Sequence, residues 1–327
     1  MANLNSKYLG IKLKNPLIVS SSGLTDSVSK IKKIENYGAG GVVIKSLFEE
    51  QINYDAGKII EQGRSDYPEA EDYINNYSKT NSVNEYLQLI KDAKKEVDIP
   101  VMASINCFSA SRWIEFASKI EEAGADALEV NVYVFPSEKK MKPSEYEKIY
   151  LDIAAKIKDT INIPFVFKLG SNFTNLVYLV DQLYYRGAAG VVLFNRFYEP
   201  DIDLNSMSFK SAEVFSTPGE ISRTLRWVGI VSDQVEDLDI AGSTGVHDGL
   251  AAIKLLLAGA TVTQTSSVLY KNGLEYIKTM ITQMEEWMKK NNFQSIDDFR
   301  GKLSYSNLQD PAIYERSQFM KYFSGIS

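Results

Sequence analysis

The chain has only one cysteine and one histidine among its 327 residues. The lone cysteine, Cys107, cannot form an internal disulfide, and we therefore expect a protein of the reducing cytoplasm. Zinc centres need several histidine or cysteine ligands, so the composition excludes a site of that kind, and we expect no metal. The chemistry must use lysine, carboxylate, hydroxyl or amide groups, or a bound cofactor.

Long apolar runs and clusters of basic residues are also missing. No window approaches the roughly 20 apolar residues needed to span a bilayer. The first ten residues, MANLNSKYLG, lack the apolar core of a signal peptide. The formal net charge is -6, which argues against nucleic acid or an anionic membrane as the main partner. We therefore expect a small-molecule substrate.

What the chain does contain is a regular alternation of short apolar runs and longer amphipathic stretches. Several runs are continuously apolar, as in parallel strands that are covered by helices. Glycines in YGAGG, EAGAD, RGAAG and LAGAT are typical helix stops ahead of the next strand. The expected strands cover residues 16–22, 41–45, 100–106, 127–132, 164–169, 189–195, 238–242 and 260–265.

Eight strands with eight connections predict an α/β fold, the closed (β/α)8 or TIM barrel. An open doubly wound sheet fits the same alternation, but the first strand–helix turn, SSSGLTD, has no GxGxxG fingerprint. Because no linker rich in proline, glycine and serine divides the chain, we expect one domain over residues 1–327. Residues 1–15 should form a hairpin at the bottom of the barrel, and residues 291–327 should pack on the barrel or on a partner subunit. Two connections, 46–81 and 196–218, are long enough to extend a site at the carboxyl ends of the strands.

The carboxyl ends of the expected strands are rich in polar residues, and this is where barrel enzymes place their active sites. Lys45 and Lys168 end apolar strands, where an ammonium group is costly unless it has an anionic or strongly accepting partner. An internal ion pair with Glu129, or a side chain that reaches the solvent, would explain either lysine alone. The two lysines together favour a bound, electron-rich ligand.

Small hydroxyl-bearing residues follow the last two expected strands. Gly242-Ser-Thr-Gly245 follows the seventh strand, and Ser266 and Ser267 follow the eighth. Small residues at these two places let backbone N–H groups approach a phosphate group. Tight packing of the turns would explain the glycines, but it explains the adjacent hydroxyls less well. The pattern therefore predicts a phosphate-bearing cofactor or substrate.

These segments together resemble the class 1 dihydroorotate dehydrogenases, which are soluble FMN-binding (β/α)8 barrels. The resemblance runs from about residue 4 to about residue 303, and it is carried by NPLIVSSSG, GVVIKS, LEVNV, VFKL, GSTGV, LLLAGATVTQTSSVLY and SIDDFRGKL. It implies an FMN-dependent oxidoreductase that converts dihydroorotate to orotate in pyrimidine biosynthesis. It also implies a homodimer.

The resemblance further implies which residues contact the cofactor and the substrate. Lys168 would lie at the N1–O2 edge of the flavin, where a fixed cation stabilises the anionic reduced form. Lys45, Asn131, Lys168 and Asn195 would take part in catalysis. The residues expected to hold FMN are Ser21, Ser22, Gly23, Lys45, Ser46, Ser104, Asn131, Lys168, Asn195, Gly242, Ser243, Thr244, Gly245, Ser266 and Ser267. The family usually has glycine where Thr244 and Ser266 stand.

The residue that removes the substrate proton in class 1 relatives is missing here. Their motif is N-L-S-C-P-N, and its cysteine takes the proton from C5 while hydride leaves C6 for the flavin. From Asn131 this chain reads NVYVFP, so Val134 or Phe135 stands in the cysteine position, and neither accepts a proton. The substrate loop N-x-x-G-L-P-N of the family is likewise replaced, by residues 61–81.

Other groups near this position were weighed as substitutes for the cysteine. Tyr133 is close in sequence, although a structural role is more common, and Ser137 and Glu138 lie on a loop that can move inward. Cys107 ends a different strand and is expected to be a small buried thiol. His247 is expected simply to start a helix.

Three hypotheses remain open from the sequence. The first is an FMN oxidoreductase of dihydroorotate dehydrogenase type that acts on dihydroorotate or a related compound. The second is a flavin-binding relative that lacks the usual base and has another substrate or no catalysis. The third is a flavin-free barrel, such as an aldolase that uses Lys168 as a Schiff base. The chain has no cysteines for an iron–sulfur cluster, so an NAD-linked route would need a separate subunit.

Overall fold

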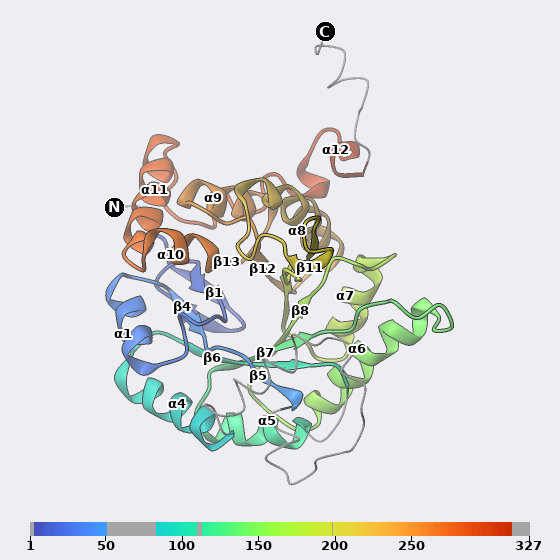
Figure 1. Ribbon diagram of the computed structural model, residues 1–327. Coiled ribbons are helices and arrows are strands. Elements are labelled where there is room, and N and C mark those ends of the chain that lie inside the picture. The colour runs from blue at the N-terminus through green and yellow to red at the C-terminus, as the bar shows by residue number, and fades with distance from the viewer. Residues whose placement is uncertain (1–2, 51–82, 110–112, 198, 316–327) are drawn as a thin grey trace.

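A computed structural model of the chain describes residues 3–50, 83–109, 113–197 and 199–315. Eight parallel strands close into a barrel with helices on its outside (Figure 1). The barrel strands are β3 (Leu17–Val19), β4 (Gly41–Val43), β6 (Val101–Cys107), β7 (Ala127–Val132), β8 (Phe165–Leu169), β9 (Gly190–Leu193), β12 (Asp239–Ser243) and β13 (Val262–Thr265). They pair in chain order, and β13 pairs with β3 to complete the ring. The predicted (β/α)8 barrel is therefore confirmed. Each expected strand range overlaps one of these strands, and β6 and β12 each end one residue beyond the expected range.

The helices bury one apolar face each against the barrel. In α4, for example, Tyr86, Ile90 and Ala93 are buried at the three- and four-residue spacing of a helix face. The helices are α1 (Val28–Asn36), α4 (Val83–Glu96), α5 (Trp113–Glu122), α6 (Pro143–Lys158), α7 (Leu176–Tyr185), α8 (Ile221–Gln234), α9 (Gly249–Ala258), α10 (Ser267–Asn272), α11 (Tyr276–Lys290) and α12 (Ala312–Glu315). Short 3-10 turns cover Pro218–Glu220 and Tyr305–Asn307.

Two antiparallel hairpins and one short strand lie outside the ring. Strands β1 (Ser6–Tyr8) and β2 (Ile11–Leu13) form the N-terminal hairpin. Strands β10 (Pro200–Asp203) and β11 (Ser208–Ser211) form an exposed hairpin in the long connection after β9. Strand β5 (Leu47–Phe48) extends the edge of β6. The replaced substrate loop, residues 61–81, lies outside the described residues.

The described part of the C-terminal segment packs on the barrel helices. Phe293 and Phe299 surround Trp287 of α11, with ring centroids 5.6 Å and 5.1 Å from the indole. The ring of Tyr314 lies so close to Gly229 of α8 that a Cβ there would come within 2.4 Å of it. Aromatic side chains therefore attach residues 291–315 to the outer layer.

The interior of the barrel changes from apolar to polar toward the carboxyl ends of the strands. One inward residue from each strand forms a buried floor with Tyr8, Leu9 and Leu13 of the N-terminal hairpin; these residues are Ile18, Val43, Met102, Ala127, Val166, Val192, Ala241 and Val262. Because side chains alternate along a strand, the next inward residues are two positions further on. On β7, β8 and β13 they are Glu129, Lys168 and Gln264, all buried. The floor thus supports a polar layer that lies next to the site.

Candidate active site

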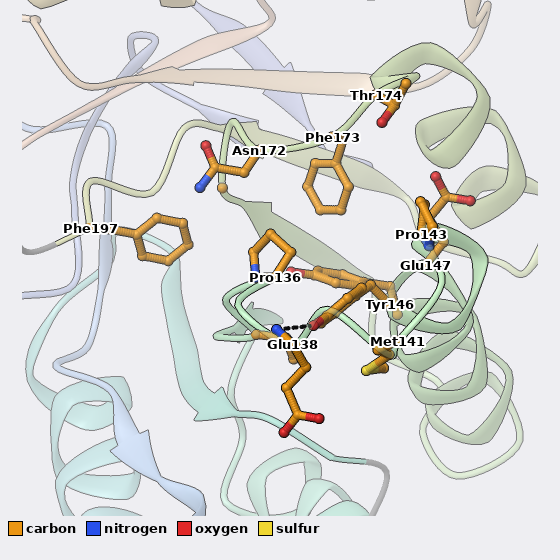
Figure 2. Close-up of a pocket in the computed structure, with 13 residues that line it drawn as sticks. Pro136, Glu138, Met141, Pro143, Tyr146, Glu147, Asn172, Phe173, Thr174 and Phe197 are labelled. Carbon is orange, nitrogen blue, oxygen red and sulfur yellow. Dashed lines mark hydrogen bonds between the residues drawn. The ribbon is translucent and has the colours of Figure 1, made fainter. Parts of the chain in front are cut away.

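Two cavities open near the carboxyl ends of the barrel strands. The smaller, of about 270 Å³, lies beside the loops that follow β7 and β8 (Figure 2). The larger, of about 430 Å³, lies at the ends of β3, β8, β9, β12 and β13, and its volume is within the range of small-molecule sites. It is lined by Ser20, Ser21, Lys168, Phe194, Asn195, Arg196, Val214, Phe215, Ser216, Ser243, Thr244, Gly245, Val246, Gln264, Thr265, Ser266, Ser267 and Tyr270.

Part of the predicted cofactor site is gathered in the larger cavity. Those of its residues that line the cavity are Ser21, Lys168, Asn195, Ser243, Thr244, Gly245, Ser266 and Ser267. Those that do not are Ser22, Gly23, Lys45, Ser46, Ser104, Asn131 and Gly242. Several of the second group lie directly behind the lining, in contact with its members, as the hydrogen bonds below show.

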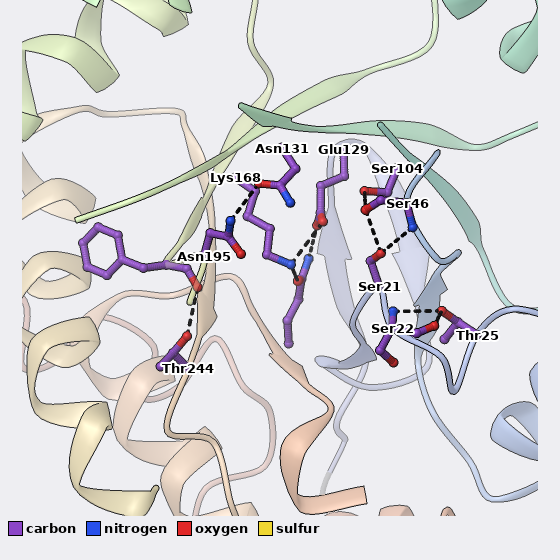
Figure 3. A network of polar contacts seen from close by, with 12 residues as sticks. Ser21, Ser22, Thr25, Ser46, Ser104, Glu129, Asn131, Lys168, Asn195 and Thr244 are labelled. Carbon is purple, nitrogen blue, oxygen red and sulfur yellow. Dashed lines mark hydrogen bonds and ion pairs between the residues drawn. The ribbon is translucent and has the colours of Figure 1, made fainter. Parts of the chain in front are cut away.

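A buried ionic network forms one wall of the larger cavity (Figure 3). The Nζ atom of Lys168 donates to Oε1 of Glu129 at 3.2 Å and lies 3.5 Å from Oε1 of Gln264. The Nε2 atom of Gln264 donates to the other carboxylate oxygen of Glu129 at 2.7 Å. The internal ion pair that the sequence left open for Lys168 is therefore present, and the same lysine also faces the cavity.

Two asparagines on either side of β8 are joined above this network. The Nδ2 atom of Asn195, which follows β9, donates to Oδ1 of Asn131 on β7 at 3.0 Å. Asn131 is only 8% exposed, while Asn195 lines the cavity. The pair presents amide groups next to Lys168, as the sequence predicted for residues at these strand ends.

A chain of serine hydroxyls lies on the β3 side of the cavity, and its member Ser21 lines the cavity (Figure 3). The Ser46 hydroxyl lies 2.9 Å from that of Ser21 and 2.8 Å from that of Ser104, and the backbone N–H of Ser46 donates to the Ser21 hydroxyl. The hydroxyl of Tyr86 on α4 accepts a hydrogen bond from the backbone N–H of Ser104 and donates one to the backbone carbonyl of the same residue. Hydrogen bonds therefore connect the ends of β3, β4 and β6.

The turn after β12 is held tightly against helix α8. The hydroxyl of Thr224 donates to the carbonyl of Ser243 at 2.9 Å. Gly245 has φ +82°, and a Cβ there would lie 2.2 Å from the backbone nitrogen of Ile221, so only glycine fits. Thr244 has φ +77°, which is unusual for a β-branched residue, and its hydroxyl donates to the carbonyl of Phe194 at 3.0 Å. Tight packing therefore explains Gly245, but the hydroxyl of Ser243 and those of Ser266 and Ser267 line the cavity.

Among the lining residues that the sequence did not identify as site residues are Arg196, Phe215, Ser216, Gln264 and Tyr270. Gln264 could have been found, because it is a polar residue two positions after the inward Val262 on a buried strand. Arg196 directly follows Asn195, and its guanidinium donates to Glu220 and to the carbonyl of Val214. No local sequence pattern marks Phe215, Ser216 or Tyr270 as a site residue.

Phe215 and Ser216 line the cavity, and contacts with three other residues hold them there. The ring of Phe215 stacks on that of Tyr270 with centroids 5.1 Å apart. The Ser216 hydroxyl lies 3.0 Å from Nε2 of His247, and the Ser216 N–H donates to the Ser267 hydroxyl. Burial, together with the nearby Lys271 ammonium, lowers the pKa of His247. His247 thus has a structural contact in addition to its expected position just before a helix.

Lys45 lies apart from the cavity that Lys168 lines. Its side chain is half-buried, and this burial lowers its pKa, while the Asp26 carboxylate opposes the shift. Nearby, Lys30 donates to the carbonyl of Gly23 at 2.7 Å. Gly23 itself leaves room for the hydroxyl of Tyr270, because a Cβ there would lie 2.8 Å from that oxygen. The structure therefore places Gly23 against a lining residue of the cavity.

The loop after β7 places apolar side chains where the proton acceptor is missing. Val134 packs against the hydrophobic core and also lines the smaller cavity. Tyr133 is 43% exposed, rather than buried, and its ring meets the edge of Phe197 with centroids 5.0 Å apart. Phe135 is 54% exposed and also faces Phe197.

The remaining candidate bases do not reach the larger cavity. Ser137 is exposed, and Glu138 lies beside the smaller cavity, where its backbone N–H donates to the Tyr146 hydroxyl (Figure 2). Cys107 is fully buried in the hydrophobic core, and desolvation raises the pKa of its thiol well above the usual value. The expectation of a small buried thiol agrees with this position.

Comparisons with known proteins agree with the geometry. Residues 3–288 match the family profile of dihydroorotate dehydrogenase. The catalytic subunit of dihydroorotate dehydrogenase B (NAD(+)) from Thermoplasma volcanium is 28% identical, over 92% of this chain and 98% of the relative. The same subunit from Pyrococcus horikoshii is 28% identical, over 91% of this chain and 97% of its own. The chloroplastic dihydropyrimidine dehydrogenase (NADP(+)) of Arabidopsis thaliana is 24% identical, over 89% and 75%. Within the described residues, no helix has the length and apolar character to cross a membrane.

Proposed function

The chain belongs to the dihydroorotate dehydrogenase family, and we propose that it works as an FMN-dependent oxidoreductase on dihydroorotate or a closely related ring. It is an oxidoreductase of dihydroorotate dehydrogenase type that acts on a CH–CH bond. The proposal concerns its cofactor, the identity of its substrate and the residues that bind both.

One observation carries the FMN proposal: a single cavity has a buried cation at one place and a turn of small residues at another. Lys168 is one lining residue, and Ser243–Gly245 with Ser266 and Ser267 are others. A flavin mononucleotide has the matching groups, an electron-accepting ring that becomes anionic on reduction and a phosphate. The donors that line the cavity therefore fit the cofactor.

The residues in and beside the cavity would bind different parts of FMN and of the substrate. The hydroxyls of Ser243, Ser266 and Ser267 would bind the phosphate, with the Arg196 guanidinium adding positive charge nearby. Lys168 would bind the ring edge, and the Asn131–Asn195 pair would orient the substrate. When bound, FMN would accept the two electrons that leave the substrate as hydride.

We further propose that the protein acts in the cytoplasm as a homodimer. Relatives named as catalytic subunits suggest that a second protein passes electrons to the acceptor. This chain has one cysteine, too few for an iron–sulfur cluster of its own. Any NAD-linked reaction would therefore need a partner that carries that chemistry.

The loop after β7 favours a second candidate, a flavin enzyme of the same type with a substrate other than dihydroorotate. Val134 and Phe135 occupy the place of the proton acceptor, and neither side chain can take a proton. Dihydroorotate turnover should then be slow, because proton removal contributes about 10²- to 10⁴-fold to such reactions.

An anaerobic titration separates these functions. The purified protein should show the visible absorbance of oxidised flavin, and dihydroorotate should bleach it. A colourless protein that takes up no FMN contradicts the cofactor proposal. A yellow protein that dihydroorotate leaves oxidised, but that dithionite reduces, supports the second candidate.

A further inference from the structure

Glu129 is a fully buried carboxylate beneath the proposed flavin site, and the proposed mechanism gives it no task. It is 1% exposed, and both of its oxygens are bound, one by Lys168 at 3.2 Å and one by Gln264 at 2.7 Å. The three side chains come from β7, β8 and β13, which hold their positions through the barrel ladder. A carboxylate fixed at both oxygens cannot rotate away from its ammonium partner.

We infer that Glu129 is a positioning residue for the reaction, which fixes the Lys168 ammonium beneath the flavin and offsets part of its charge. The inference rests on the proposed function, because it assumes that FMN occupies the larger cavity. Gln264 completes the arrangement by holding the second oxygen of Glu129. The redox behaviour of the cofactor would then depend on an acidic residue that does not line the cavity.

A lysine side chain is flexible, so its ammonium group needs an acceptor to hold it in one place. Its four-carbon stem and compact charge leave the ammonium group free to move unless acceptors hold it. Here Glu129 takes one donor at 3.2 Å, and the Gln264 oxygen lies 3.5 Å away. Lys168 is only 7% exposed but lines the cavity. Its remaining donor capacity is therefore available to a ligand on the cavity side.

The charges of Glu129 and Lys168 also act on the flavin. An unpaired ammonium in a buried layer is unfavourable, so the carboxylate makes the charged lysine tolerable there. The same carboxylate repels the negative charge that the flavin gains on reduction. Lys168 should therefore raise the midpoint potential of the bound flavin, and Glu129 should lower it. A residue with a purely structural role would not act on the potential with a defined sign.

The test compares Glu129→Gln, Lys168→Gln and the double variant with the wild type. Glutamine keeps the size of Glu129 and removes its charge. The midpoint potential of bound FMN is measured by equilibrium reduction against redox dyes, and flavin affinity by titration of the apoprotein. We expect Glu129→Gln to bind reduced FMN at least tenfold more tightly relative to oxidised FMN, a rise of about 30 mV for two electrons. Lys168→Gln should shift the ratio in the opposite direction, and the double variant should lie between the two.

Glu129→Asp covers the case in which Glu129→Gln does not fold. It keeps the charge but withdraws it by one methylene from Lys168. The affinity for reduced FMN relative to oxidised FMN should therefore rise about threefold, and the midpoint potential should rise with it. An unchanged potential in Glu129→Gln, or in Glu129→Asp where only that variant folds, overturns the inference. So does a shift in the same direction as that of Lys168→Gln. A wild type that binds no FMN overturns the proposed function and this inference together, whereas a yellow wild type with unresponsive variants overturns the inference alone.

Discussion

The side-chain amide of Asn195 donates a hydrogen bond to the amide oxygen of Asn131 at 3.0 Å, across the strand that carries Lys168. Residues 64 positions apart in the sequence are thus joined at the carboxyl ends of the barrel strands. Because the two amides orient each other, removing either should disturb both.

Replacement of Asn131 or Asn195 by alanine should lower kcat/KM for the substrate by about 10- to 100-fold, the effect of losing one strong hydrogen bond. The double variant should lose less than the product of the single effects, because each asparagine positions the other. Stopped-flow kinetics of flavin reduction by the substrate measure the losses of the single and double variants. Strictly multiplicative losses would show that the two residues act separately.

The turn after β12 offers a test of packing at the proposed phosphate site. Gly245→Ala places a Cβ 2.2 Å from the nitrogen of Ile221 and keeps a left-handed φ. We expect the free energy of unfolding to fall by at least about 2 kcal/mol, with weaker FMN binding. Urea denaturation and flavin titration measure the two effects.

Gly219→Ala is the matched control for Gly245→Ala, because the nearest atom to its added Cβ is 4.0 Å away, in Thr217. It should leave both stability and FMN affinity within about 0.5 kcal/mol of the wild type. Equal effects at the two glycines would mean that the turn is not held as the structure shows.

The partial burial of His247 makes the stability of the fold depend on pH. Burial and Lys271 lower the pKa of His247 in the folded protein. Between that pKa and the unfolded value of about 6.5 the unfolded state binds more protons, so stability rises with pH and falls on acidification through this window. The melting temperature of the wild type should therefore drop more between pH 7 and pH 5 than that of His247→Gln. Parallel curves for the two proteins would contradict this assignment.

The position of Cys107 predicts its reactivity. The side chain is fully buried, and burial raises the pKa of its thiol, so little thiolate is present and reagents cannot reach it. In the folded protein, iodoacetamide should label Cys107 at least about 100-fold more slowly than in urea. Mass spectrometry of the intact protein follows the labelling. Rapid labelling in the native state would reopen the possibility that this thiol serves the reaction.

The sequence predicted the barrel well because its signals are local. Continuous apolar runs and helix-stop glycines mark each strand and helix, and closure of the ring follows from their number. Glu129 was one of the partners weighed for Lys168, but Gln264 was harder to predict, since it comes from a strand 96 residues further along the chain. The same holds for Phe215 and Ser216, whose places depend on contacts with Tyr270 and His247 that no local pattern encodes.

Lys45 does not line the cavity that Lys168 lines. Strand β4 ends at Val43, and the backbone N–H of Lys45 then donates to the carbonyl of Thr25 rather than to the neighbouring barrel strand. The break in the ladder is a tertiary feature that the run GVVIK does not reveal.

The apolar side chain at Val134 leads to the most direct test of the proposed chemistry. It lies on the loop that follows Asn131 and is, with Phe135, one of the two residues that can stand in the position of the family's proton acceptor. Val134→Cys supplies a thiol there with little change in volume. If the rest of the site is intact, flavin reduction by dihydroorotate should accelerate by about tenfold or more, and the rate should rise with pH toward the ordinary thiol pKa near 8.5. Val134→Ala is the control, because it opens similar space without a titratable group and should give no such pH dependence. An acceleration shared by both variants would indicate a steric effect, and none in either would show that this loop does not face the reacting carbon.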